Sequence, residues 1–85
     1  MTHDQAVVLV TSLIGRIRHI SPAQISEAVR LADDLGFDSL DAAELLAALH
    51  KETGRQLDLD SVNGMRTVRD IAGGLVSHPE RLKAS

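Results

Sequence analysis

Apolar residues recur at intervals of three and four along three stretches of the chain, the spacing that places them on one face of an α-helix. We predict helices over about residues 3–19, 39–53 and 67–77, with one short helical turn over 60–65. Pro79 is expected to stop the last helix, because proline cannot continue the hydrogen-bond pattern. The chain is therefore predicted to be all-α: a small four-helix bundle of three main helices plus a short third helix, with a long first loop.

The ends of these helices carry residues that favour helix termini. Thr2 followed by Gln5 predicts a capping box, in which each side chain bonds the other's backbone N–H. Asp38 and Thr67 are expected to cap the starts of the second main helix and the last helix. Gly54 is expected to end the second helix in the left-handed conformation.

A long connection joins the first two main helices, from Pro22 to Gly36. Pro22 disfavours helical geometry at Ser21, so the first helix ends before it. A connection of about fifteen residues is unusually long for a compact bundle and is often functional. Its sparse apolar residues predict that it is pinned to the core: Ile25, Val29, Leu31 and Leu35.

The length of 85 residues predicts a single domain over 1–85, with an ordered core at about 3–77 and a polar tail at 78–85. A core this small leaves little room for a deep catalytic cleft, which disfavours an enzyme. Phe37 is the only aromatic residue and the formal charge is −3. Both facts oppose nucleic-acid binding, which uses stacking side chains and basic surfaces.

The absence of cysteine excludes disulfides and thiolate metal sites, and it fits a cytoplasmic protein. No apolar run approaches the roughly 20 residues of a membrane-spanning helix. We therefore expect a cytoplasmic monomer that contacts neither membranes nor nucleic acids. The cap at Thr2 and the short polar tail suggest a free-standing protein.

The stretch 33–41 carries the candidate chemistry. Gly36 permits a tight turn and Asp38 caps, so Ser39 falls at the first helical position, beside unpaired N–H groups that favour an anion. Acidic residues surround this serine, and no basic residue lies between 31 and 49. A free anion would be repelled there. A phosphodiester attached covalently by a basic partner is compatible with both features.

The segment 35–40, Leu-Gly-Phe-Asp-Ser-Leu, resembles the L-G-x-D-S-L signature of acyl carrier proteins. The acidic pair 33–34 precedes it, as in that family. The residues at 22–25 (PAQI) resemble the start of the family's long first loop, and those at 41–45 (DAAEL) resemble its D-x-x-E-L continuation. The residues at 67–70 (TVRD) are similar to its T-V-x-D start of the last helix.

This resemblance implies that Ser39 carries a covalent 4′-phosphopantetheine, taken from coenzyme A through a separate phosphopantetheinyl transferase. The arm would hold acyl groups as thioesters, and the carrier itself would catalyse nothing. Asp38 would orient the serine or help the transferase's metal ion, while the chain would hold no metal of its own. Leu40, Asp41 and Glu44 would form the face that acyl-loading, ketosynthase or acyltransferase-type enzymes read.

Asp38 before the serine favours an acyl carrier over peptidyl carriers, and Phe37 makes the signature look most like that of polyketide carriers. Housekeeping fatty-acid carriers are usually more acidic beyond this point, whereas basic residues dilute the charge after residue 49. We therefore predict a polyketide or related natural-product pathway. The alternatives are an aminoacyl or peptidyl carrier of a nonribosomal pathway, a cofactor-free helical adaptor, and a helix-turn-helix nucleic-acid binder.

Three other patterns bear on function. Ser39 and His50 cannot form a nucleophilic pair, because eleven helical residues separate them by roughly 16 Å. The acidic stretch 58–69 lacks the glycine and the final glutamate of a calcium loop. The glycine pair at 73–74 predicts either a weak last helix or space for an acyl group or for a closely packed helix.

Overall fold

A computed structural model describes the fold over residues 1–54 and 67–84, with side chains up to Val76 in the second range. Within these ranges the chain is helical, and its single β-type pairing is an isolated bridge between Arg30 and Thr67. The prediction of a small all-α bundle is confirmed. The elements in chain order are α1 (His3–Arg18), the 3₁₀ turn η1 (Pro22–Gln24), α2 (Leu31–Leu35), α3 (Ser39–Thr53) and α5 (Val68–Ala84).

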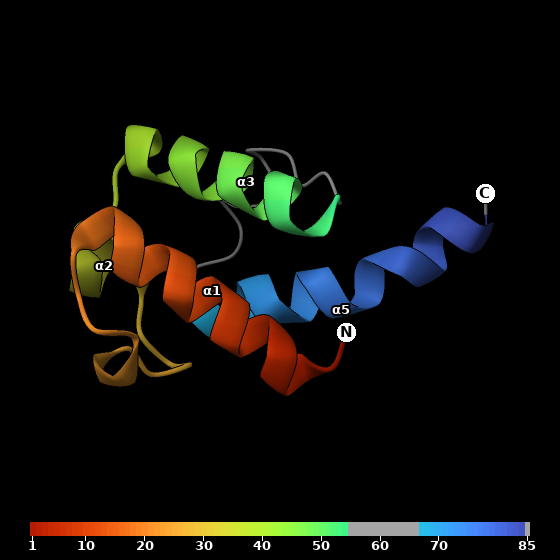
Figure 1. Cartoon of the computed structure of the whole chain (residues 1–85), viewed down its shortest axis with the longest axis horizontal. Coiled ribbons are helices and arrows are strands. Elements are labelled where there is room, and N and C mark those ends of the chain that lie inside the picture. Colours follow the sequence, from red (N-terminus) through yellow and green to blue (C-terminus); the bar gives the residue numbers. More distant parts are fainter. Residues whose placement is uncertain (55–66, 85) are drawn as a thin grey trace.

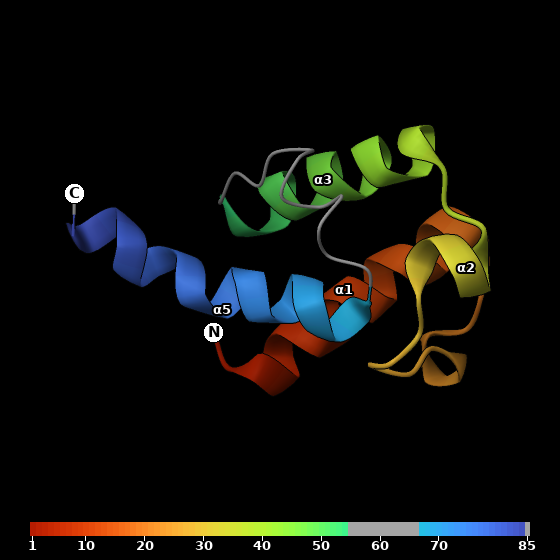
Figure 2. The same ribbon diagram turned by 180° about the vertical axis from the view of Figure 1, so that it is seen from behind.

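Helix α1 is the centre of the arrangement, because it packs against both α3 and α5. Figures 1 and 2 show α3 and α5 along α1, with the short α2 beside the end of α1 and the start of α3. The core lies between these helices and includes the apolar stripe predicted for each. Its buried side chains are Ala6, Val10, Leu13, Ile14, Ile25, Leu31, Leu45, Leu49, Val68, Ile71, Ala72 and Leu75.

The predicted helix caps are present. Thr2 and Gln5 form the capping box of α1, and Asp38 caps α3. Gly54 follows α3 with φ of +72°, the left-handed conformation expected of a glycine at this position. Thr67 caps α5 in a reciprocal arrangement with Asp70, since each backbone N–H donates to the other's side chain at 3.2 Å.

The long connection contains a helix that the sequence pattern did not predict. At the start of helix α2 no side chain caps the first turn, but the N–H of the preceding Arg30 donates to Asp34 Oδ2 at 2.8 Å. Gly36 then ends the helix at φ of +70°, and the N–H of Phe37 donates to the carbonyl of Leu31 at 3.0 Å. These two local features make a stable turn of helix from only five residues.

The prediction that the connection is pinned to the core is confirmed. Ile25 and Leu31 are buried, while Val29 and Leu35 are half-buried against the core. Backbone bonds add to this packing, because the N–H of Val68 donates to the carbonyl of Val29 at 3.3 Å. The connection is thus tied to the start of α5 and holds α2 in place.

The prediction that Pro79 ends the last helix is wrong, because α5 continues to Ala84. Proline fixes φ near −65°, which a helix tolerates, so it removes one backbone hydrogen bond and bends the helix without ending it. The ribbon of α5 changes direction along its length in Figure 1. The predicted turn at 60–65, and most of the rejected calcium loop, lie outside the described residues.

Gly73 was one of two glycines for which the sequence left open a role in close helix packing. A Cβ placed on this glycine would meet no atom of the described residues within 4 Å. Close approach of a described helix therefore does not require a glycine at this position.

Candidate functional site

The candidate site is the turn that joins α2 to α3. Gly36 takes the left-handed conformation that ends α2, and half-buried Phe37 anchors the turn on the core. Asp38 is extended and caps the next helix, so Ser39 is the first residue of α3. The sequence predicted this position for the serine, and the capping chemistry on both sides of it explains why the chain folds so.

Ser39 is exposed to solvent. Among the residues that the structure describes, no group bonds its hydroxyl, and the backbone N–H groups of Ser39 and Leu40 also have no partner. Such N–H groups at the start of a helix favour a nearby anion. An exposed, unbonded hydroxyl beside two free N–H groups fits a phosphodiester at this residue.

Asp38 and Asp41 form a reciprocal capping box around the serine. The N–H of Asp41 donates to Asp38 Oδ1 at 2.9 Å, and the N–H of Asp38 donates to Asp41 Oδ2 at 3.3 Å. The two carboxylates are therefore turned towards the backbone of the first helical turn. This arrangement fixes the direction in which α3 begins and hence the position of Ser39.

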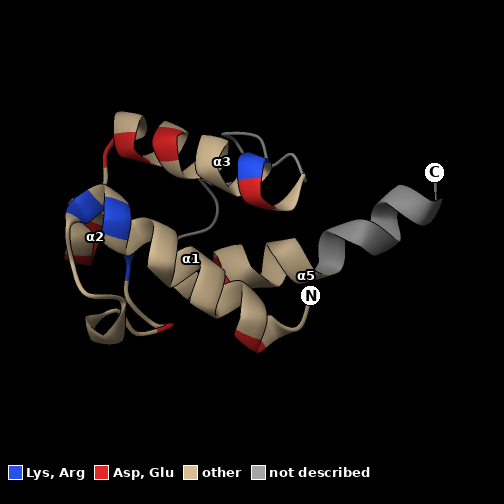
Figure 3. Ribbon diagram, in the orientation of Figure 1, with Lys and Arg blue, Asp and Glu red and all other residues tan. Residues whose placement is uncertain are grey.

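Although no basic residue lies between 31 and 49, two arginines outside this segment contact its carboxylates. Arg18, at the end of α1, places Nη1 at 3.3 Å from Asp41 Oδ2. Arg30 lies 3.6 Å from carboxylate oxygens of both Asp33 and Asp34. Arg30 is a sequence neighbour of the acidic pair, whereas Arg18 lies 23 residues before Asp41 and reaches it only because α1 packs against α3. Figure 3 shows basic positions at the end of α1 near acidic positions at the start of α3.

The pKa of the Asp34 carboxyl is lowered by a hydrogen bond within the same segment. The backbone N–H of Arg30 donates to Asp34, and this hydrogen bond holds the pKa of that carboxyl below its ordinary value of 3.8. Asp34 is therefore ionised at neutral pH and belongs to the start of α2.

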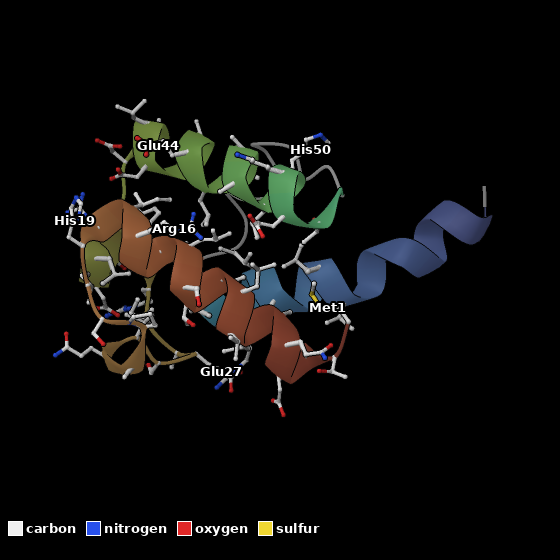
Figure 4. The ribbon with its side chains drawn as sticks, viewed as in Figure 1. Met1, Arg16, His19, Glu27, Glu44 and His50 are labelled. Atoms are coloured by element: carbon white, nitrogen blue, oxygen red, sulfur yellow. The ribbon has the colours of Figure 1, made fainter. Side chains whose placement is uncertain are left out.

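The three residues predicted to form the docking face differ in their exposure. Leu40 is 69% exposed, and Glu44 is also open to solvent. The side chain of Asp41 is only 15% exposed, because Arg18 and the capping turn cover it. Glu44 lies on the early part of α3, with the end of α1 nearby (Figure 4).

Other candidate chemistry is not assembled in the described part of the chain. Ser39 begins α3 and His50 lies in its last turn, so the two form no catalytic pair (Figure 4). No group of three potential metal ligands occurs among the described side chains. No helix within the described ranges is long and apolar enough to cross a membrane.

Comparison with known proteins agrees with this geometry. Residues 8–75 match the family model described as the phosphopantetheine attachment site. Over 77 residues the chain is 30% identical to acyl carrier protein 2 of Ralstonia nicotianae, covering 91% of this chain and 95% of that protein. The chain belongs to the acyl carrier protein family.

Two further relatives carry the same name. An acyl carrier protein of Zymomonas mobilis is 37% identical over 59 residues, covering 69% of this chain and 76% of that protein. An acyl carrier protein of Saccharopolyspora erythraea is 43% identical over 52 residues, covering 61% of this chain and 55% of that protein.

Membership assigns this carrier a covalently attached 4′-phosphopantetheine, and acyl carrier proteins are non-catalytic. It disfavours the cofactor-free adaptor and the nucleic-acid binder. Sequence reasoning placed Ser39 correctly at the start of the helix but missed the contact of Arg18 with this turn. The only sequence signal was the basic end of the first helix, which does not reveal a carboxylate 23 residues away.

Proposed function

We propose that Ser39 is the residue to which the 4′-phosphopantetheine is attached, and that the chain presents acyl groups to partner enzymes from this point. The observation that carries the proposal is the exposed, unbonded hydroxyl of Ser39 at the first position of α3, next to two free backbone N–H groups. The bound group supplies a terminal thiol that holds acyl groups as thioesters.

Attachment requires a phosphoryl transfer to the serine. Ser39 Oγ attacks phosphorus in the pyrophosphate of coenzyme A, an Oγ–P bond forms, and the P–O bond to the adenosine bisphosphate breaks. The serine proton has to leave to a base on a separate transferase, because no described side chain bonds this hydroxyl. The chain therefore supplies position and access, and the transferase supplies the catalytic groups.

The residues around Ser39 have two separate roles in this proposal. Asp38 and Asp41 fix the first turn of α3 through their capping box. Leu40 and Glu44 offer an exposed apolar side chain and an exposed carboxylate on the same helix. A partner surface with an apolar pocket flanked by lysine or arginine complements these two groups, and charge complementarity of this kind speeds encounter.

The test is the intact mass of the protein before and after incubation with a phosphopantetheinyl transferase and coenzyme A. We expect the wild type to gain the mass of one phosphopantetheine group and Ser39→Ala to gain nothing. Ser21→Ala, an exposed serine in the long connection, should be modified like the wild type. Ser39→Ala should fold normally, because Asp38 still caps α3. An unmodified wild type, or equal modification of Ser39→Ala, would remove the proposal.

We also propose that the carrier serves a polyketide or related natural-product pathway. The supports are Phe37 within the signature and the mixed charge, to which Arg16 and Arg18 contribute exposed basic side chains close to the site. Deletion of the gene should then leave the cell's fatty acids unchanged and abolish a secondary metabolite. A changed fatty-acid profile would assign the carrier to fatty-acid synthesis. Loading by an amino-acid-activating enzyme would instead favour the aminoacyl alternative.

A further inference from the structure

Arg18 reaches from the end of α1 to the first turn of α3. Its Nη1 lies 3.3 Å from Asp41 Oδ2, and a Cβ placed on Gly36 would lie 3.8 Å from its Nη2. The guanidinium group therefore sits over the turn that leads into Ser39. This places a fixed positive charge of the carrier's own beside the residue that partner enzymes have to reach.

We propose that Arg18 is a specificity-determining residue that competes with partner enzymes for Asp41. The proposal rests on the proposed attachment at Ser39. In it, Arg18 occupies Asp41 in the free carrier, so that a partner whose lysine or arginine approaches the first turn of α3 has to displace Arg18. A partner that reads only Leu40 and Glu44 meets no such competitor.

The environment of Asp41 supports this competition. Oδ2 accepts the N–H of Asp38 at 3.3 Å as well as the contact from Arg18. The side chain is 15% exposed, although the neighbouring Leu40 is 69% exposed. Arg18 thus makes the carboxylate of Asp41 less accessible to a partner, although this carboxylate belongs to the first turn of α3, next to Ser39.

Glu44 provides the contrast on the same helix. It is exposed, and within the described residues it forms no ion pair. The carrier therefore presents one open carboxylate at Glu44 and one occupied carboxylate at Asp41. A partner whose basic side chain approaches Asp41 has to displace Arg18, and one that approaches Glu44 does not, so Arg18 can discriminate between basic surfaces that carry the same net charge.

The contact is suited to displacement. The side chain of Arg18 is 38% exposed, so water reaches the guanidinium side of the pair although Asp41 itself is only 15% exposed, and such partly solvated pairs are weak. Displacing a weak exposed pair changes affinity by about two- to fivefold, which corresponds to at most about 1 kcal/mol. A competitor of this strength tunes the choice of partner without blocking access to Ser39.

The experiment measures transfer of phosphopantetheine from coenzyme A by a phosphopantetheinyl transferase whose carrier-binding surface has a basic side chain facing the first turn of α3. We expect Arg18→Gln to lower the KM for the carrier about two- to fivefold and to leave kcat unchanged. Release of a docking carboxylate strengthens binding but does not alter the reacting atoms. Arg18→Lys, which keeps the charge, should stay close to the wild type.

Two controls separate competition from general charge. Arg16→Gln changes the net charge equally on the same helix, and in the described chain Arg16 makes no ion pair, so its KM should change less than that of Arg18→Gln. In the Asp41→Asn background, Arg18→Gln should no longer lower KM. Circular dichroism should show that each variant keeps its helices.

The outcomes distinguish the two proposals. A wild type that gains no mass would overturn the attachment at Ser39. A modified wild type with an unchanged or higher KM for Arg18→Gln would overturn the competition alone. An equal decrease for Arg16→Gln, or a decrease that persists beside Asp41→Asn, would also overturn the competition, since the effect would then be one of overall charge.

Discussion

The two ends of α1 are tied to the rest of the molecule by polar contacts of different kinds. At its beginning, His3 Nε2 donates to Glu27 Oε1 at 2.9 Å, and Arg69 Nε lies 3.5 Å from the same oxygen. The N–H of Arg69 also donates to the carbonyl of Glu27 at 3.0 Å. At its end, Arg18 meets Asp41 through side chains alone.

The first tie joins three elements through one residue of the long connection and includes a backbone hydrogen bond. It contains none of the predicted site residues, so its role is to hold the connection against α1 and α5. The second tie lies beside Ser39, has no backbone component and consists of one ion pair. The difference indicates that the contacts away from the site join three elements, whereas the contact beside Ser39 joins only α1 and α3.

The most severe way to disturb the second tie is to remove the cap beneath it. Asp38→Ala should lower the free energy of unfolding by about 1–2 kcal/mol, because it leaves a backbone N–H of α3 unpaired and breaks the capping box. Urea denaturation measures this loss. Thr2→Ala, which breaks the capping box of α1 far from Ser39, is the matched variant. If Asp38→Ala proved neutral, the cap would not determine the start of α3.

Gly36 tests the turn over which Arg18 lies. Gly36→Ala should lower the free energy of unfolding by about 1 kcal/mol, because φ is +70° and a side chain disfavours the left-handed conformation.

Gly73→Ala provides the opposite case. It should stabilise α5 by up to about 1 kcal/mol, since alanine favours a helix and a Cβ meets no described atom there. Thermal denaturation compares the two. A loss of stability for Gly73→Ala would mean that this position requires glycine.

The contact between His3 and Glu27 should make the stability of the fold depend on pH in the acidic range. The hydrogen bond from His3, with a smaller contribution from the nearby Arg69, holds the pKa of Glu27 below its ordinary value of 4.5, although desolvation opposes this shift. A lowered carboxyl pKa contributes stability above pH 4.5 that is lost as the pH falls through the folded value. Melting temperatures of the wild type should therefore fall more steeply below pH 4.5 than those of Glu27→Gln.

Glu44→Gln is the control for that measurement, because Glu44 is exposed and makes no ion pair in the described ranges. It should keep the acid dependence of the wild type. If Glu27→Gln kept the same slope as well, the contact with His3 would contribute nothing to folding.

The smallest effect is expected from the second tie itself. Arg18→Gln should change the free energy of unfolding by less than about 0.5 kcal/mol, because the pair with Asp41 is solvated. Urea denaturation beside Arg16→Gln checks this. A loss well above 1 kcal/mol would show that Arg18 holds α1 and α3 together.

The sequence by itself determined the helices, their apolar faces and the position of Ser39. Thr2 with Gln5, and Asp38 before Ser39, act over three residues, so their geometry follows from local chemistry alone. Gly54 ends α3 for the same reason. Two local outcomes were not predicted: α2, which needs the side chain of Asp34 as an acceptor, and the passage of α5 through Pro79.

The tertiary structure decided which charges are paired. Glu27 lies 24 residues from His3, and Asp41 lies 23 residues from Arg18, so no periodicity reveals either contact. Both arise because packing of apolar faces fixes how the ends of α1 lie against the connection and α3. Asp41 was predicted, from the resemblance, to belong to the docking face with Leu40 and Glu44, and only the fold pairs it with Arg18.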